Sequence, residues 1–396
     1  MKGRRITLWL LALVNFTNIM DVMIMMPLAD LFMYEFDIDT GTFAFLIASY
    51  GLAAFFSSLC GVFLLDKFPR RKSLLFIYAG FVIGTFLCGL APTFYLLLVI
   101  RFTTGLFGGI IGALALSIVS DVYKFKERGQ AIGALMAAFS AAAALGVPAG
   151  FYLATLWGWQ SPFFIIAGVG LIIWIIAYFK FPEIYIDPEE TEDYTPFELI
   201  QKIVNNSNIL FALLLGFVVV LGHFLIIPFI TPYMTHNVGF EQTDITYIYL
   251  VGGLLTVVSA PIIGRLTDKY GVTKVFFAVM IISFVPVVWL TNLGPSTVPM
   301  ALVVTTLFFV FGSGRMLPPQ SLITSAVGPD LRGSFMSLKS ALQQAAIAFA
   351  AVIGGAIISE NPDKKIINYE IVGYLSVAIC ILAMILTPKI KVVKGN

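Results

Sequence analysis

Long apolar runs alternate along the chain with short polar segments. A helix of about 20 apolar residues crosses the ~30 Å hydrocarbon core of a bilayer, so each run predicts one membrane-spanning helix. Most connections between the runs are short, which makes successive helices antiparallel neighbours. The pattern predicts an all-α polytopic membrane protein. Its twelve predicted spans cover residues 7–33, 43–65, 73–92, 94–120, 130–156, 161–180, 208–235, 244–266, 274–292, 298–326, 334–358 and 367–387.

The composition agrees with this pattern. Of the 396 residues, 59% are hydrophobic and 12% are charged. Soluble proteins keep about a quarter of their residues charged. The first run is too long for the apolar core of a signal peptide, and no small-residue cleavage site follows it, so we expect it to be retained. Cys60, Cys88 and Cys380 lie inside apolar runs and are interpreted as buried apolar side chains.

Lysine and arginine gather on one side of the predicted topology. The loops on the opposite side hold only Lys364 and Lys365. Because cytoplasmic loops are enriched in positive charge, both termini are predicted to be cytoplasmic, which requires an even number of spans. We expect a multi-pass protein of the cell (inner) membrane. The cytoplasmic set is Lys2, Arg4, Arg5, Lys67, Arg70, Arg71, Lys72, Lys124, Lys126, Arg128, Lys269, Lys274, Arg332, Lys389, Lys391 and Lys394.

The acidic, polar segment 181–207 divides the chain into two halves of similar length. We expect an N-terminal six-helix bundle over 1–180, a cytoplasmic linker over 181–207 and a C-terminal six-helix bundle over 208–396. An internal repeat supports the division, because the sequence DKFPRRK after the second span returns as DKYGVTK after the eighth. Two halves in the same orientation are parallel repeats, which place a substrate site between them near mid-membrane.

The loop after the second span matches a family signature. Its residues fit the pattern G-x-x-x-D-R-x-G-R-R/K of the major facilitator superfamily, and the chain is similar to that family over its whole length. The matching residues are Asp66, Lys67, Arg70, Arg71 and Lys72.

Each copy of this signature departs from the pattern. In the first, Val62 and Pro69 stand where the family has glycine. The second copy has both glycines but lacks the arginine, and its matching residues are Gly264, Asp268, Lys269 and Gly271. The two copies nevertheless lie between the expected pairs of spans.

Two further segments resemble motifs of this family. RFTTG, from Arg101 to Gly105, is similar to its intramembrane arginine motif. Gly146-Val-Pro148-Ala-Gly150 is a variant of the G-P-x-x-G-G motif of drug and sugar antiporters. Three segments resemble the arabinose-efflux-type branch of these antiporters: residues 15–27, 223–234 and 314–316. The resemblance implies alternating access, proton antiport and a cytoplasmic gate formed by Asp66, Arg70, Arg71, Asp121, Asp268, Lys269 and Arg332.

Four ionisable side chains lie deep in apolar runs, at Asp21, Arg101, His223 and Arg315. Asp21 is about 14 residues, or roughly 21 Å, into an outward-running helix. Arg101 lies roughly 10 Å from the outer side on an inward-running helix. These depths agree, so the sequence predicts an ion pair between the two side chains. The pair either carries the coupling proton on Asp21 or only locks two helices together, and we favour the first alternative.

The other polar residues inside the membrane leave two alternatives each. His223 is either a proton carrier or a packing residue. Arg315, which precedes a proline pair, either binds substrate or hydrogen-bonds the backbone carbonyls that the prolines free. We place Arg315 among candidates for the substrate cavity, together with Asn15, Asn18, Gln343 and Gln344. The asparagines either bind substrate hydroxyls or hydrogen-bond a neighbouring helix.

These features predict a secondary active transporter, with protons as the coupling ion and no cofactor or metal. The leading hypothesis is a proton-coupled antiporter that exports a sugar or a drug-like molecule, and the alternative is a symporter that imports a small nutrient. No phosphate-binding glycine motif and no catalytic or metal-binding cluster occurs, so we expect neither an ATP-driven pump nor an enzyme. The expected partners are the small-molecule substrate and the lipid bilayer but no nucleic acid, and the expected state is a monomer.

Overall fold

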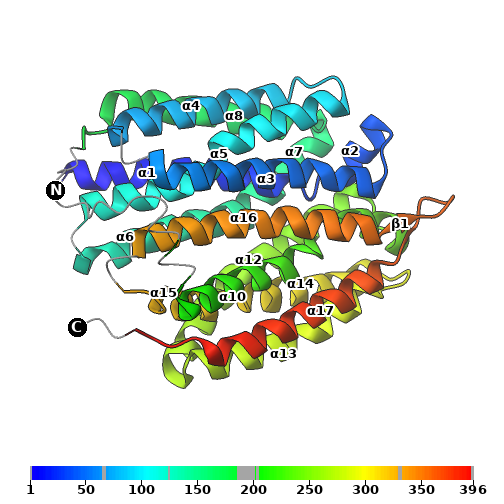
Figure 1. The fold of residues 1–396 in the computed structure, drawn as a ribbon. Helices are drawn as coiled ribbons and strands as arrows, with labels where there is room; N and C mark the ends of the chain where they lie inside the picture. Colours follow the sequence, from blue (N-terminus) through cyan, green and yellow to red (C-terminus); the bar gives the residue numbers. More distant parts are fainter. Residues whose placement is uncertain are drawn as a thin grey trace.

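The computed structural model describes residues 2–64, 68–123, 125–184, 201, 205–328 and 332–393. Long helices lie side by side in one bundle (Figure 1). The first half contains α1 (Lys2–Ile24), α2 (Ala29–Phe36), α3 (Thr40–Leu64), α4 (Arg70–Cys88), α5 (Phe94–Val122), α6 (Phe125–Ala141), a π-helix (Ala142–Gly146), α7 (Val147–Trp157) and α8 (Ser161–Lys180). Most of the predicted linker, residues 185–200 and 202–204, lies outside the described residues.

The second half repeats this order of long helices. It contains α10 (Ser207–Phe224), a 3-10 helix (Ile227–Phe229), α11 (Ile230–Tyr233), a π-helix (Met234–Val238), α12 (Gln242–Tyr270), α13 (Val272–Thr291), α14 (Val298–Gly314), α15 (Leu317–Ser325), α16 (Arg332–Ile357), α17 (Tyr369–Leu386) and a 3-10 helix (Thr387–Lys389). A two-stranded antiparallel hairpin, β1 (Ser359–Glu360) and β2 (Ile366–Ile367), joins α16 to α17.

The predicted membrane spans are present. Within the described ranges, eleven helical stretches are long and apolar enough to cross a membrane, and the shorter apolar helix Ala142–Trp157 adds to them. That helix continues α6 and corresponds to the span predicted over 130–156. The prediction of a helical fold with twelve spans is therefore confirmed, and the β1–β2 hairpin is a small addition to it.

Several spans are broken where the sequence carries proline. The first span ends at Ile24, and a turn over Met25–Leu28 that contains Pro27 leads into α2, so the predicted span 7–33 was too long. Pro148 cannot donate a backbone hydrogen bond, and the five-residue π-helix of that span lies directly before it. Turns also interrupt the seventh and tenth spans, close to Pro228 and Pro318.

The two ends of the bundle differ in how the halves pack. We call the end where α1 begins and α17 finishes the terminal end, and the end with β1 and β2 the hairpin end (Figure 1). Toward the hairpin end, one apolar core contains side chains of both halves, such as Phe32 and Phe43 together with Phe229 and Tyr369. Toward the terminal end, each half has a core of its own.

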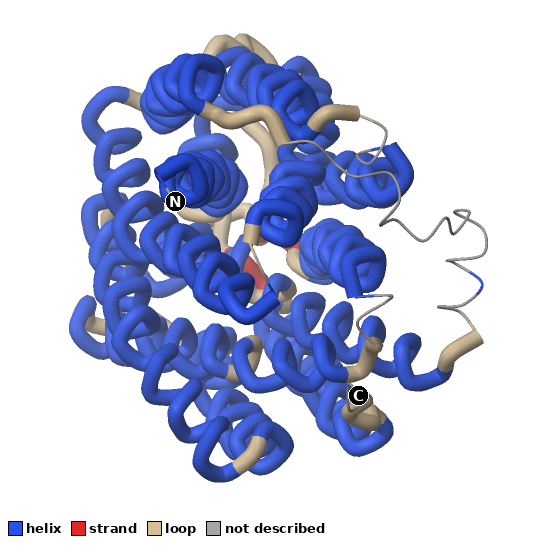
Figure 2. Tube along the Cα trace, turned by 90° about the vertical axis from the view of Figure 1, so that its left-hand side faces the viewer, coloured by secondary structure: helices blue, strands red, loops and turns tan. Residues whose placement is uncertain are grey.

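Figure 2 looks along the bundle from the terminal end and shows many helices end-on. Large apolar side chains are exposed on the outer surface, and Trp9, Phe76, Tyr95 and Phe179 are each more than two-thirds exposed. A surface of this kind is stable against lipid rather than water. The molecule is thus a polytopic membrane protein.

Candidate functional site

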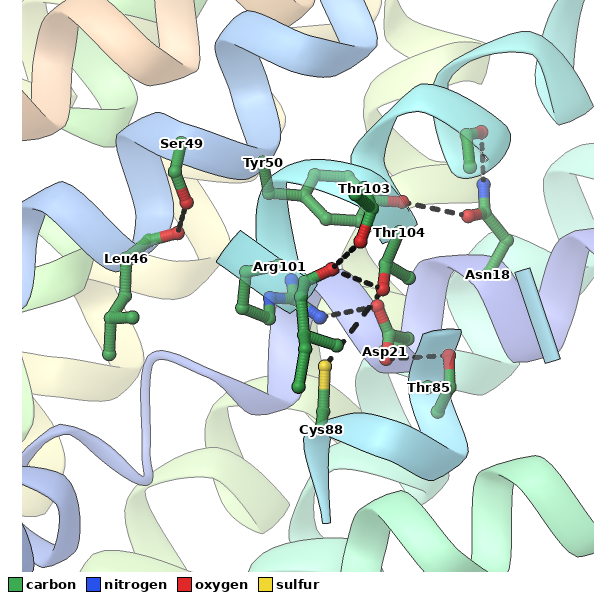
Figure 3. Close-up of polar contacts among 12 residues, drawn as sticks. Asn18, Asp21, Leu46, Ser49, Tyr50, Thr85, Cys88, Arg101, Thr103 and Thr104 are labelled. Carbon is green, nitrogen blue, oxygen red and sulfur yellow. Dashed lines mark hydrogen bonds and ion pairs between the residues drawn. The ribbon is translucent and has the colours of Figure 1, made fainter. Parts of the chain in front are cut away.

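Asp21 and Arg101 form a buried ion pair between α1 and α5 (Figure 3). Arg101 Nη1 donates to Asp21 Oδ2 over 2.7 Å. The exposed fractions of the two side chains are 0% for Asp21 and 1% for Arg101. The pair that helix depth predicts is therefore present.

Each end of this pair has a further contact. Thr85 of α4 donates its hydroxyl to Asp21 Oδ1 over 3.1 Å, so both carboxylate oxygens accept a hydrogen bond. The guanidinium carbon of Arg101 lies 4.5 Å from the ring centroid of Tyr50 on α3, which is a cation–π contact. Arg101 Nε has no hydrogen-bond partner among the described residues. The carboxylate is thus better satisfied than the guanidinium.

Polar contacts within the first half hold Tyr50 in place (Figure 3). Its hydroxyl donates to Asn18 Oδ1 over 3.1 Å, and Asn18 Nδ2 donates to the carbonyl of Gly108 over 3.3 Å. Asn15 Nδ2 donates to the carbonyl of Leu135 over 3.4 Å. Of the two alternatives for the asparagines, the structure therefore shows hydrogen bonds to neighbouring helices.

The ion pair adjoins the contact between the halves. A small cavity of about 10 Å³ lies there, close to the space that one water molecule needs. Its polar lining comes from Tyr50 and Arg101 of the first half and Gln344 of the second. Val22, Met25, Ile47, Gly51 and Ile347 complete the lining. Gln343 is not part of this lining, so only one of the two predicted glutamines lines this cavity.

The glycines of the antiporter-type motif pack against α1 next to Asp21. A Cβ atom at Gly146 would lie 3.1 Å from the sulfur of Met20, and one at Gly150 would lie 2.9 Å from Ile24 Cδ1. Small residues let helix backbones approach closely in a membrane. Pro148 lies between these glycines in the first turn of α7. This segment therefore packs closely against the helix that carries the carboxylate.

His223 and Arg315 lie in the second half, and neither has a described contact with Asp21. His223 stacks on Phe308, with ring centroids 5.7 Å apart, and its Nδ1 has no hydrogen-bond partner within the described structure. Arg315 is fully buried, donating from Nη1 to Cys380 Sγ over 3.1 Å and from Nη2 to the carbonyl of Gly222 over 3.2 Å. The sequence offered a hydrogen bond from Arg315 to backbone carbonyls that the proline pair frees on the same helix. That alternative was wrong, because the carbonyl that Arg315 contacts is that of Gly222 in α10.

Sequence comparison decides the family. The model of the Major Facilitator Superfamily matches residues 11–230 and 212–393. The chain belongs to the major facilitator superfamily. It is therefore a membrane transporter of small molecules, and the family is not one of enzymes.

Relatives and solved structures of the superfamily agree with this assignment. An uncharacterized MFS-type transporter of Bacillus subtilis, YbcL, is 25% identical over 96% of this chain and 95% of its own. A probable sugar efflux transporter of Helicobacter pylori is 26% identical over 63% of this chain and 62% of its own. The crystal structure of a D-xylose-proton symporter is similar with a TM-score of 0.75 at 15% identity, covering 95% of this chain and 96% of that one.

The superfamily signature lies at the terminal end, where the structure describes only part of it. Arg70 Nε donates to Asp121 Oδ2 over 2.8 Å, joining α4 to α5. Arg71 donates to the carbonyl of Tyr178 over 2.6 Å and lies 3.4 Å from Glu183. Asp66, which the resemblance places in the same gate, lies outside the described residues.

In the second copy of the signature, the described side chains form no ion pair with Asp268. Asp268 and Lys269 are both exposed, and Lys269 Nζ lies 5.1 Å from the ring centroid of Tyr270 instead. Adjacent residues on a helix point in different directions, and no contact between Asp268 and Lys269 is present among the described residues, which leaves Arg332 as the other partner expected for Asp268 in this gate. Arg332 begins α16, and its side chain lies outside what the structure describes.

The polar contacts that sequence reasoning missed include three that involve ionisable side chains within or beside the spans. Lys339 donates to Gln320 between α16 and α15, and its side chain is almost fully buried. The other two contacts join the halves: His236 pairs with Asp30, and Glu360 accepts hydrogen bonds from Thr40. Asp30 and Lys339 both lie inside predicted apolar runs, and this signal could have drawn attention to them.

Proposed function

We propose that the chain is a proton-coupled antiporter that exports a small organic molecule, a sugar or a drug-like compound, by alternating access. The observation that carries the proposal is the fully buried carboxylate of Asp21, paired with Arg101. A buried ionisable group in a membrane is a functional candidate by default, because its burial is expensive and buried pairs add little net stability.

The ion pair lets a proton change the interactions between helices. When Asp21 takes up a proton it loses its charge, and Arg101 is left as a buried cation without an anion. This state is unfavourable, so Arg101 must find another partner or more water. Arg101, Tyr50 of the first half and Gln344 of the second half line the same small cavity. Proton uptake at Asp21 is therefore proposed to change how the halves meet.

The orientation belongs to the same proposal. The excess of lysine and arginine in the loops at the terminal end supports a cytoplasmic position for both termini. The halves then share a core on the outer side and have separate cores on the cytoplasmic side. That packing supports a conformation that is closed to the outside.

Two observations favour export over import. The glycine motif beside Asp21 is a variant of the drug and sugar antiporter motif, and one relative is named as a probable sugar efflux transporter. The alternative is a symporter that imports a small nutrient. It is supported by the structural similarity to a D-xylose-proton symporter, although a fold shared at 15% identity is compatible with either direction.

The test is uptake into proteoliposomes under pH gradients of opposite sign. Labelled sugars and drug-like compounds are first screened for the one that most raises the melting temperature of the purified protein. An antiporter accumulates that compound when the vesicle interior is acidic, because protons leave as the compound enters. A symporter accumulates it only when the exterior is acidic. Equal uptake without a gradient would contradict proton coupling in both forms.

A further inference from the structure

Asp30 and His236 form a hydrogen-bonded pair between the two halves at the hairpin end. Asp30 lies in the first turn of α2, and His236 lies in the π-helix that follows α11. His236 Nε2 and Asp30 Oδ1 are 2.7 Å apart. The exposed fractions of the two side chains are 22% for His236 and 13% for Asp30. The contact is therefore partly shielded from solvent, which strengthens a hydrogen bond relative to one at the surface.

A second polar contact joins the halves at the same end. Glu360 of β1 accepts a hydrogen bond from the backbone nitrogen of Thr40 over 2.6 Å, and it also accepts one from the Thr40 hydroxyl. Thr40 is the first residue of α3, where the backbone NH groups have no partner within the helix. The carboxylate of one half thus caps a helix of the other half and lies at the positive end of its dipole.

The backbones of the two halves approach closely beside this cap. A Cβ atom at Gly41 would lie 3.1 Å from the carbonyl oxygen of Gly355. One at Gly355 would lie 2.6 Å from the Cβ of Ala44. Both glycines therefore permit α3 and α16 to meet where Glu360 reaches Thr40.

We propose that these contacts form a latch that holds the hairpin end closed, with Asp30–His236 and Thr40–Glu360 as its two polar parts. Each contact joins one half to the other, so both must break before the halves can separate at this end. Asp21 and Arg101, by contrast, both belong to the first half. The latch thus sets the balance between conformations directly, whereas the ion pair acts through neighbouring helices. The inference shares with the proposed function the assumption of alternating access. It does not depend on proton coupling or on the identity of the substrate.

The latch is tested by a distance measurement that needs neither substrate nor a pH gradient. Spin labels are attached at Tyr34→Cys on α2 and Asp363→Cys between β1 and β2, which are both exposed positions. The parent carries Cys60→Ser, because Cys60 is exposed and not buried as the sequence indicates, whereas Cys88 and Cys380 are buried. Pulsed electron paramagnetic resonance in lipid nanodiscs then reports the separation of the halves. Asp30→Asn combined with Glu360→Gln should raise the population at longer distance roughly fivefold or more, which is the effect of losing hydrogen bonds of ordinary strength.

Asp39→Asn is the matched control. Asp39 is an exposed carboxylate at the same end, but it accepts a hydrogen bond from the backbone of Thr42 in its own half over 2.8 Å. Its distance distribution should equal that of the parent. In a second control the two residues of the pair are exchanged, as Asp30→His with His236→Asp, which keeps a hydrogen bond between the halves. The distance distribution of this variant should lie closer to that of the parent than the distribution of Asp30→Asn with Glu360→Gln does. If the double variant does not fold, His236→Gln serves in its place. A latch variant whose distribution coincides with that of Asp39→Asn would overturn the proposal, whatever the result of the transport assays.

Discussion

Arg101 on α5 donates to the carboxylate of Asp21 on α1 over 2.7 Å, in a site that exposes neither side chain by more than 1%. Removal of one partner from such a pair leaves the other as an uncompensated buried charge. The proton and the guanidinium therefore compete for the same carboxylate. This competition links the chemistry of one side chain to the arrangement of helices.

Substitution of Arg101 should change the pH dependence of transport. In Arg101→Ala the proton no longer competes with a cation, so the pH profile of transport should move toward higher pH and proton release should slow. Arg101→Lys should recover only part of the activity, because an ammonium group lacks the planar fork of the guanidinium. Transport rates measured between pH 5 and 9 in proteoliposomes check this. A profile for Arg101→Ala that matches the wild type would show that Arg101 only packs.

The position of Tyr50 over Arg101 depends on a glycine. A Cβ atom at Gly108 would lie 1.9 Å from the Tyr50 hydroxyl and 2.9 Å from Asn18 Oδ1. Gly108→Ala should therefore displace the ring, destabilise the protein by about 1–3 kcal/mol and lower the transport rate. Gly112→Ala on the same helix is the control, because a Cβ atom there has no neighbour within 4 Å. Melting temperatures and transport rates of the two variants are compared. Equal values would contradict a role for the Tyr50 contact.

The ion pair at the terminal end should stabilise the first half. Arg70 is almost fully buried, whereas Asp121 is 26% exposed. Asp121→Asn should lower stability by about 1 kcal/mol, which a thermal melt of the purified protein can measure. Glu183→Gln changes a more exposed carboxylate, 59% exposed, at the same end and should have a smaller effect. A larger loss of stability in Glu183→Gln would reverse this order and contradict the account.

The fold could be predicted from the sequence because a membrane allows few solutions. Backbone groups in lipid must be satisfied within the helix, so each long apolar run becomes a helix. The predicted bounds of a span were wrong where a single residue such as proline ends a helix inside an apolar run, because the mean hydropathy of the run does not reveal such a break. Pro27 and its neighbours form a turn, so the first span is shorter than its hydropathy indicates.

Part of the candidate site could also be predicted. Asp21 and Arg101 lie at matching depths, and depth follows from the rise per residue of a helix. The direction of a side chain does not follow from depth. Asn18 donates to a neighbouring helix and Arg315 bonds α10, because the rotation of each helix is set by packing. Contacts between the halves, such as Asp30 with His236, depend on how two separate bundles meet, and one sequence carries little signal for that.

The central claim is that Asp21 carries the coupling proton, and proton movement in proteoliposomes tests it most directly. Vesicles with a pH-sensitive dye inside are given a gradient of the screened substrate. The wild type and the Asp39→Asn control should both move protons. Asp21→Asn keeps the shape of the side chain but cannot cycle a proton, so it should exchange labelled substrate without any change in internal pH. Continued proton movement in Asp21→Asn, at the rate of the control, would contradict the account.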